Sequence, residues 1–304
     1  MPKPPNILRG VVIPAAGLGT RLRPLSLGCP KELLPLGDYP ALTACLLEAE
    51  AAGLAPVALV SSPEKPGLAL LHRSLTALSE ISTDAGHTPQ SRYLADLWRR
   101  LGLRLIEQPQ PLGVLDAVER SIGALPPPPS LTDRPQTAVA VLFPDLLHLP
   151  DQTALAGLVA AYQQTGQAVF GLRRAEPAGP QGSTLAVQLA PPFDELAPAA
   201  IPTGTPLPIR ALRPSTGQPN ELLTTFGQIQ TPAWDAALAR FCRDAATGTL
   251  RDGGFLAALN TLASDGGLCG TLLPGTVLDL GSLPGYAAAV HHFSVAGARL
   301  RGLP

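Results

Sequence analysis

The feature that most limits how this chain can fold is an apolar run at residues 11–14 that leads into a glycine-rich segment. A short β-branched run followed by glycine is typical of a buried strand and a tight turn. Gly17 and Gly19 have no Cβ, so their backbone N–H groups can approach an anion closely. Arg21 and Lys31 bring positive charge to the same region. The pattern predicts a strand and loop that bind phosphate.

The glycine spacing differs from that of the two common phosphate-binding loops. It lacks the Gly-Lys-Ser/Thr ending of a P-loop, and it does not complete the three glycines of the dinucleotide fingerprint. One alternative is that the glycines only turn the chain and that the charged side chains are solvated.

A longer match favours the phosphate-binding interpretation. The chain reads A-A-G-L-G-T-R-L-R-P over residues 15–24 and P-K-E-L-L-P over residues 30–35. This order resembles the A-A-G-x-G-T-R-x-x-P and P-K-x-x-L-P signature of the sugar-1-phosphate nucleotidyltransferases. The helical insertion before Gln108 is most similar to the bacterial UTP-glucose-1-phosphate uridylyltransferases. The resemblance implies that Arg21 and Lys31 are catalytic and that five loop residues bind nucleotide: Ala15, Ala16, Gly17, Gly19 and Thr20.

Composition is consistent with a small-molecule enzyme. The 304 residues, 45% of them hydrophobic and 15% charged, can bury one large α/β core or two smaller ones. A net charge of −1 gives no long-range attraction to nucleic acid or an anionic membrane. No apolar run reaches the roughly 18 residues of a membrane span, and the N-terminus does not resemble a secretory signal. We therefore expect a cytoplasmic protein with reduced cysteines, no nucleic-acid partner and no membrane partner.

The order of predicted elements favours an α/β fold. Helical spacing at residues 41–52 and a strand at 56–61 form a βαβ unit with the first strand, so the ligand is expected at the carboxyl ends of a parallel sheet. Further patterns predict a helical stretch with a polar break at 83–91, a stiff proline-rich linker at 126–129, and the elements 67–100 (helical), 103–107 (strand), 116–122 (helix), 138–143 (strand) and 168–173 (strand).

The family resemblance implies a particular architecture. It is a Rossmann-like mixed, mostly parallel sheet flanked by helices, of the nucleotide-diphospho-sugar transferase type. We expect residues 1–304 to form a single nucleotidyltransferase domain. About residues 8–150 would form its nucleotide-binding half, and about 151–290 its sugar-phosphate half.

Two aspartates are candidate Mg²⁺ ligands. Asp145 follows the predicted strand at 138–143 and matches the family's strand ending in P-D. Asp279 matches a segment before the closing helix. Mg²⁺ is usually held by one or two carboxylates together with substrate phosphates. The alternatives are a strand-end aspartate that caps a turn at 145 and an ordinary turn aspartate at 279.

The sugar-phosphate motif matches less well. Gly182 falls where the family keeps a glycine near the sugar, and Leu212-Arg213-Pro214 stands where the family has E-K-P. Arg213 can still neutralise a phosphate, although its planar fork differs from a lysine point charge. Leu212 cannot accept a hydrogen bond from a sugar hydroxyl. Arg213 as a solvated loop residue is the alternative.

The base-reading motif also departs from the family pattern of Q followed by G-x-G-H-A. Gln108 and Gly113 match and are candidate nucleotide-binding residues, but Leu115 replaces the second glycine and Asp116 the histidine. Leu115 could crowd a base. Gln108 as an ordinary strand-end residue is an equal alternative.

The resemblance implies joining of a nucleoside triphosphate, with UTP favoured, to a sugar-1-phosphate, with Mg²⁺ as cofactor. Pyrophosphate would leave from the α-phosphorus. A homo-oligomer is left open. The rival hypothesis is a catalytically inactive relative that binds a nucleotide or sugar phosphate and regulates, since Leu212, Leu115 and Asp116 all depart at recognition positions.

Overall fold

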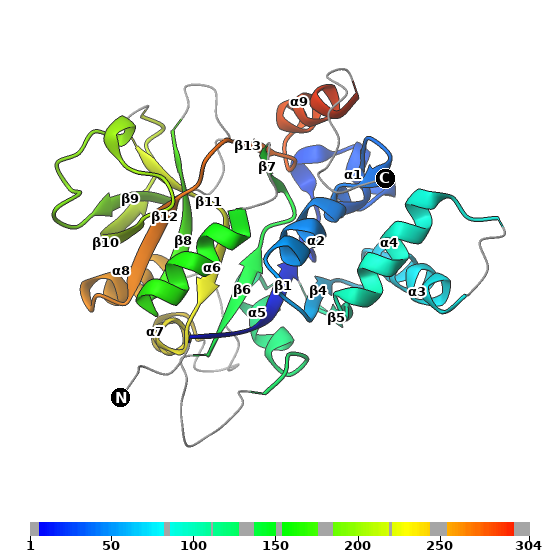
Figure 1. Cartoon of the computed structure of the whole chain (residues 1–304), viewed down its shortest axis with the longest axis horizontal. Coiled ribbons are helices and arrows are strands. Elements are labelled where there is room, and N and C mark those ends of the chain that lie inside the picture. The colour runs from blue at the N-terminus through cyan, green and yellow to red at the C-terminus, as the bar shows by residue number, and fades with distance from the viewer. Residues whose placement is uncertain are drawn as a thin grey trace.

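A nine-stranded mixed sheet forms the frame of the molecule, in the order β5-β4-β1-β6-β11-β8-β12-β10-β9 (Figure 1). The structure is a computed structural model that describes residues 6–81, 86–110, 112–127, 137–149, 154–175, 185–218, 221–243 and 254–294. Strands β11 and β10 run opposite to the others, which confirms the predicted mixed, mostly parallel sheet. The strands are β1 (Ile7–Pro14), β4 (Val57–Ser61), β5 (Arg104–Glu107), β6 (Thr137–Leu142), β8 (Ala168–Arg174), β9 (Leu185–Leu189), β10 (Pro206–Pro214), β11 (Leu222–Gln230) and β12 (Leu268–Leu272).

The first four strands in the sheet order, β5, β4, β1 and β6, are mutually parallel. Side chains of a strand alternate between the two faces of a sheet. Val11 and Ile13 of β1 accordingly belong to one buried cluster, and Val12 belongs to another. Burial on both faces explains why this strand is a continuous apolar run rather than an alternating one.

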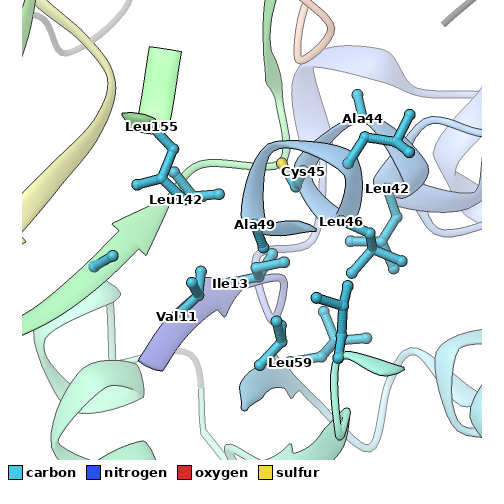
Figure 2. Close-up of a cluster of buried hydrophobic side chains, with 14 of the residues drawn as sticks. Val11, Ile13, Leu42, Ala44, Cys45, Leu46, Ala49, Leu59, Leu142 and Leu155 are labelled. Atoms are coloured by element: carbon cyan, nitrogen blue, oxygen red, sulfur yellow. The ribbon is translucent and has the colours of Figure 1, made fainter. Parts of the chain in front are cut away.

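Helices cover both faces of the parallel part. Figure 2 shows Leu46 and Ala49 of α2 in one buried cluster with Ile13 of β1 and Leu59 of β4. Each fully buried leucine or isoleucine side chain here contributes roughly 1.5–3 kcal/mol. Helix α5 packs on the opposite face through Ala117 and other residues. The described helices are α1 (Leu25–Gly28), α2 (Leu42–Ala51), α3 (Pro66–Glu80), α4 (Pro89–Arg100), α5 (Val114–Ile122), α6 (Ala154–Thr165), α7 (Pro232–Cys242), α8 (Phe255–Ser264) and α9 (Leu283–Ser294).

The other end of the sheet curls into a closed ring. Val187 of β9 pairs with Leu212 of β10 on one side and with Leu222 of β11 on the other. The ring therefore closes through β11, β8, β12, β10 and β9. Its apolar cluster includes Trp234 of α7, whose ring lies 5.2 Å from that of Phe170 between centroids.

Most predicted elements are confirmed with small shifts in their ends. The first strand begins at Ile7, before the predicted residue 11, and α5 begins at Val114, before the predicted residue 116. Helix α3 ends before the predicted break at 83–91, but α4 begins at Pro89, so the prediction of a break is wrong for residues 89–91. Residues 83–85 of the break lie outside the described part. The same holds for residues 128–129 of the proline run. Within the described ranges, no helix has the length and apolar character that a membrane crossing requires.

Two small antiparallel sheets complete the site region: β2 (Pro35–Leu36) with β3 (Tyr39–Pro40), and β7 (Leu146–Leu149) with β13 (Thr276–Asp279). The carboxyl ends of β1, β4, β5 and β6 lie along one edge of the sheet because these strands are parallel. The glycine-rich segment, Gln108 and Asp145 each follow one of them.

Candidate active site

The glycine-rich segment leaves β1 with its first residue still tied to the sheet, because the Ala15 N–H donates to the Val60 carbonyl at 2.8 Å. Gly19 then adopts a φ of 64° and starts a short 3₁₀ helix, Thr20–Leu22. A side chain at that φ would be strained. Gly17 has no such need, and a Cβ built there would meet no atom within 4 Å. The open space beside Gly17 leaves the backbone accessible to a ligand.

The predicted catalytic cations and the predicted metal ligands lie together. Lys31 Nζ is 2.6 Å from Asp145 Oδ2, and Arg21 Nη1 is 3.2 Å from Asp279 Oδ2. Arg21 Nη2 also lies 4.0 Å from Asp145 Oδ2. Two cations and two carboxylates therefore form one network, of which Arg21 is the most exposed member.

The two aspartates are held side by side by the small sheet of β7 and β13. Asp279 is the register partner of Leu146, the residue after Asp145. The Leu280 N–H donates to the Asp145 carbonyl at 2.7 Å, which locks the two strand ends together. Backbone pairing thus explains how two residues so far apart in the sequence share one site.

Gly281 leaves a small space between these charged groups. A Cβ at this position would lie 2.8 Å from Arg21 Nη2, 2.9 Å from Asp279 Oδ1 and 3.2 Å from Asp145 Oδ2. The Gly281 N–H donates to Asp279 Oδ1 at 2.8 Å, so it orients that carboxylate. Two neighbouring carboxylates are a donor set that suits a small, hard cation. Within the described ranges, no cluster of three or more His, Cys, Asp or Glu residues could hold a metal.

A buried ion pair between Lys65 and Glu32, which the sequence analysis did not assign, supports the glycine-rich segment. Lys65 Nζ donates to both oxygens of Glu32, at 2.8 and 3.0 Å, and to the Ala15 carbonyl at 2.7 Å. Burial lowers the pKa of Lys65, and the Glu32 carboxylate acts in the opposite direction. Lys65 therefore connects the start of the glycine-rich segment to the residue that follows Lys31. The available signal was the scarcity of lysine, because Lys65 is one of only three in the chain.

The sequence of this region matches a known family. A family described as Nucleotidyl transferase matches residues 10–182, which is more than half of the chain. The chain belongs to the nucleotidyl transferase family. The matched residues include the glycine-rich segment, Lys31 and Asp145.

Individual members of the nucleotidyl transferase family are also similar. A UTP-glucose-1-phosphate uridylyltransferase of Staphylococcus saprophyticus is 29% identical over 174 residues, which is 56% of each chain. One of Mycoplasma pneumoniae is 30% identical over 174 residues, 57% of this chain and 55% of its own. The chain thus aligns with just over half the length of these curated relatives.

Solved structures resemble the whole chain in fold. A UDP-glucose pyrophosphorylase complexed with UDP-glucose has a TM-score of 0.70 at 18% identity and covers 96% of this chain and 99% of its own. A UTP-bound UGPase from Acinetobacter baumannii has a TM-score of 0.69 at 20% identity and covers 98% and 95%. At these identities the likeness shows the fold, which agrees with the architecture that the sequence resemblance implied.

The residues predicted to lie beside the base are found at the same sheet edge. Gln108 is buried, and its side-chain nitrogen donates to the Gly113 carbonyl at 3.0 Å and to Asp116 Oδ2 at 2.7 Å. Gly113 adopts a φ of 98°, which favours glycine, and it precedes α5. Leu115 is buried in the apolar cluster of the strand ring.

The predicted sugar-side residues Leu212 and Arg213 both contact other groups of the protein. Leu212 is buried in the same apolar cluster as Leu115, and its backbone N–H and carbonyl both bond to the side chain of Asn260. Arg213 Nη1 lies 2.7 Å from Glu221 Oε1. Gly182, the other predicted sugar-phosphate residue, lies outside the described part of the chain.

Glu221 is a strongly bound carboxylate beside Arg213. Burial raises its pKa, but hydrogen bonds from Ser215, from Thr216 and from Arg213 outweigh that effect and lower the pKa to about 2. Sequence reasoning did not single out Glu221. It places a carboxylate beside Arg213, the residue that follows Leu212, because it directly precedes β11 and Arg213 lies near the end of β10.

Proposed function

We propose that this member of the nucleotidyl transferase family joins a nucleoside triphosphate, with UTP favoured, to a sugar-1-phosphate and releases pyrophosphate. The observation that carries the proposal is the convergence of Arg21, Lys31, Asp145 and Asp279 beside an open glycine-rich loop. The names of the relatives, UTP-glucose-1-phosphate uridylyltransferases, support the choice of UTP and of glucose-1-phosphate.

The proposed reaction is a single in-line displacement. An oxygen of the sugar-1-phosphate attacks the α-phosphorus of the triphosphate, a new P–O bond forms, and the bond to the pyrophosphate oxygen breaks. In such a step the protein mainly positions the reactants and neutralises charge. Arg21 neutralises the triphosphate and the leaving pyrophosphate, and Lys31 stabilises the charge on the reacting phosphates. The backbone of Gly17 and Gly19 approaches the phosphate oxygens.

Mg²⁺ is the proposed cofactor, held by Asp145 and Asp279. When bound, Mg²⁺ would neutralise negative charge on the substrate phosphates. Before substrates bind, Lys31 and Arg21 pair with these aspartates and offset the repulsion between the two carboxylates. When substrates bind, the Lys31 and Arg21 side chains can each move from a carboxylate to a phosphate within the site.

We propose that residues 1–304 act as one domain with two halves. Residues 8–150 would bind the nucleotide through the loop (Ala15, Ala16, Thr20 and the two glycines), Gln108 and Gly113. Residues 151–290 would bind the sugar phosphate, with Gly182 and Arg213 as candidate contacts. Leu212, buried in the apolar cluster, leaves the hydroxyl-binding role to another group.

The test is pyrophosphate release by the purified full chain with Mg²⁺. UTP, dTTP, CTP, GTP and ATP are each paired with a panel of sugar-1-phosphates. We expect release with one triphosphate and one sugar phosphate, and none when Mg²⁺ is omitted. A folded protein that is silent across the panel, yet is thermally stabilised by a triphosphate, would instead favour the inactive regulatory relative.

A further inference from the structure

The side-chain amide of Gln108 is held in one orientation. Its nitrogen lies 3.0 Å from the Gly113 carbonyl oxygen and 2.7 Å from Asp116 Oδ2. A backbone carbonyl and a carboxylate only accept hydrogen bonds, so the amide atom that faces both of them must be the nitrogen. The two partners together exclude the flipped amide.

Asp116 is itself fixed. The same Oδ2 atom accepts from Arg120 Nε at 2.7 Å, one turn further along α5, and Asp116 is buried. A charged pair at this spacing on a helix is favourable. The carboxylate that orients Gln108 is therefore paired with a cation of its own and does not depend on a ligand.

Only an acceptor remains on the Gln108 side chain. Both amide hydrogens are committed to Gly113 and Asp116, and the amide oxygen accepts no hydrogen bond from the residues that the structure describes. A group that binds to Gln108 must therefore donate a hydrogen bond to it.

One strand, β4, lies between Gln108 and the start of the phosphate loop. The Gln108 backbone N–H donates to the Ser61 carbonyl at 2.7 Å, while the Ala15 N–H donates to the Val60 carbonyl on the other side of β4. Adjacent strands are about 4.8 Å apart, so about 10 Å separates Gln108 from the start of the loop. One nucleotide can bridge such a separation, with its phosphates on the loop and its base near Gln108.

We infer that Asp116 is a positioning residue for base selection: it presents the Gln108 amide oxygen to a base that donates from its ring N3–H. This inference rests on the proposed function. Uracil and thymine carry that N3–H. Cytosine has a lone pair at N3, which would face the lone pairs of the amide oxygen, so the site rejects it. Asp116, which replaces the histidine of the family pattern, thus becomes a determinant of specificity.

The experiment measures equilibrium binding of UTP, CTP and 3-methyl-UTP to the full chain with Mg²⁺, with turnover followed in parallel. A site built around one hydrogen bond discriminates strongly against an analogue that cannot make it. We expect the wild-type chain to bind UTP at least about tenfold more tightly than either analogue. In Asp116→Asn the new side chain can donate or accept, so only the Gly113 carbonyl still fixes the Gln108 amide, and the UTP preference over CTP falls to about threefold or less. Glu119→Gln, on the exposed side of the same helix, should leave the preference unchanged.

Each result decides the matter. An unchanged UTP preference in Asp116→Asn, or no preference in the wild type, overturns the positioning role. If Asp116→Asn does not fold, Gln108→Ala must lose the same preference. Selective binding that depends on Asp116 but without turnover overturns the proposed function and leaves this inference standing. No binding of any of the three triphosphates overturns both.

Discussion

Two lysines of this chain make nearly the same contact in opposite surroundings. Lys31 lies 2.6 Å from Asp145, and Lys65 lies 2.8 Å from Glu32. The first pair is partly exposed, at 14% and 24% of the side-chain surface, whereas the second is enclosed, at 5% and 0%. Water and a phosphate ligand can reach Lys31, but neither can replace the partners of Lys65.

The difference separates two uses of the same chemistry. An ion pair near the surface is worth little to stability, about 0–1 kcal/mol, so its cation can be released to a ligand at small cost. A buried charge that loses its partner is strongly destabilising. We therefore interpret the Lys31 pair as exchangeable and the Lys65 pair as permanent support for the loop that begins at Ala15.

The largest expected effect is on turnover in Lys31→Ala. Loss of a preorganised charge at the reacting phosphates should lower kcat by about a thousandfold, while the free energy of unfolding changes by less than about 1 kcal/mol. Pyrophosphate release and urea unfolding measure the two quantities on the same sample. Arg99→Ala, which removes an exposed cation on α4, is the control and should change neither. Full turnover in Lys31→Ala would remove Lys31 from the proposed mechanism.

Lys65→Met should show the opposite balance, with a large loss of stability. It leaves the Glu32 carboxylate buried without a cation, which costs about 3 kcal/mol or more, and it removes the donor to the Ala15 carbonyl. The double variant Lys65→Met with Glu32→Leu replaces the pair with apolar groups and should recover most of the stability. Turnover should stay low in the double variant because the loop is still untethered. Equal stability of the single and double variants would contradict the permanent-support interpretation.

Gly281→Ala tests the network of Arg21, Lys31, Asp145 and Asp279 by placing a methyl group against it. The added methyl would meet Arg21, Asp145 and Asp279 at 2.8–3.2 Å, so one of these groups must shift. Because catalysis depends closely on geometry, we expect turnover to fall about tenfold to a hundredfold. The matched control is Gly123→Ala, where a Cβ would meet nothing within 4 Å. Similar kinetics in the two variants would show that the space beside Gly281 is not needed.

Sequence reasoning reached the parts of the site that lie in one short segment or end a recognisable strand. Gly19, Arg21 and Lys31 belong to one continuous motif, and Asp145 directly follows an apolar run. The meeting of Asp145 with Asp279 was implied by the family pattern and is explained by the pairing of β7 with β13. Apolar runs likewise predicted β1, β4 and β6, because the central residues of these strands are buried on both faces.

The parts that sequence reasoning missed depend on contacts that no local pattern encodes. Glu32 and Lys65 are 33 positions apart, and neither stands in a spacing that marks a pair. Leu212 lies in a strand that closes a ring, so its burial follows from partners on β9 and α8 rather than from its neighbours in the chain. The resemblance named the position but not the direction in which the side chain points.

Glu48 gives the smallest expected effect in the comparison of paired and unpaired charges. It is a buried carboxylate that, unlike Glu32, has no partner such as Lys65 among the described residues. Its Oε2 accepts from the Leu155 N–H at 3.0 Å, and no described residue bonds to its Oε1. Burial raises its pKa to about 7 from an ordinary 4.5, although the N–H groups of Leu155 and Ala154 partly oppose the shift.

Between these two pKa values the folded chain binds more protons than the unfolded chain. The contribution of Glu48 to stability is therefore complete below about pH 4.5 and is lost as the pH rises through about 7. Glu48→Gln cannot ionise, so its stability relative to the wild type should improve by roughly 2 kcal/mol between pH 5 and pH 8. Urea unfolding at the two pH values measures the difference, and Glu80→Gln on the exposed side of α3 is the control. A Glu48→Gln effect that is the same at both pH values would mean that this carboxylate stays charged in the fold, and that burial without a cation costs less here than the Lys65 pair implies.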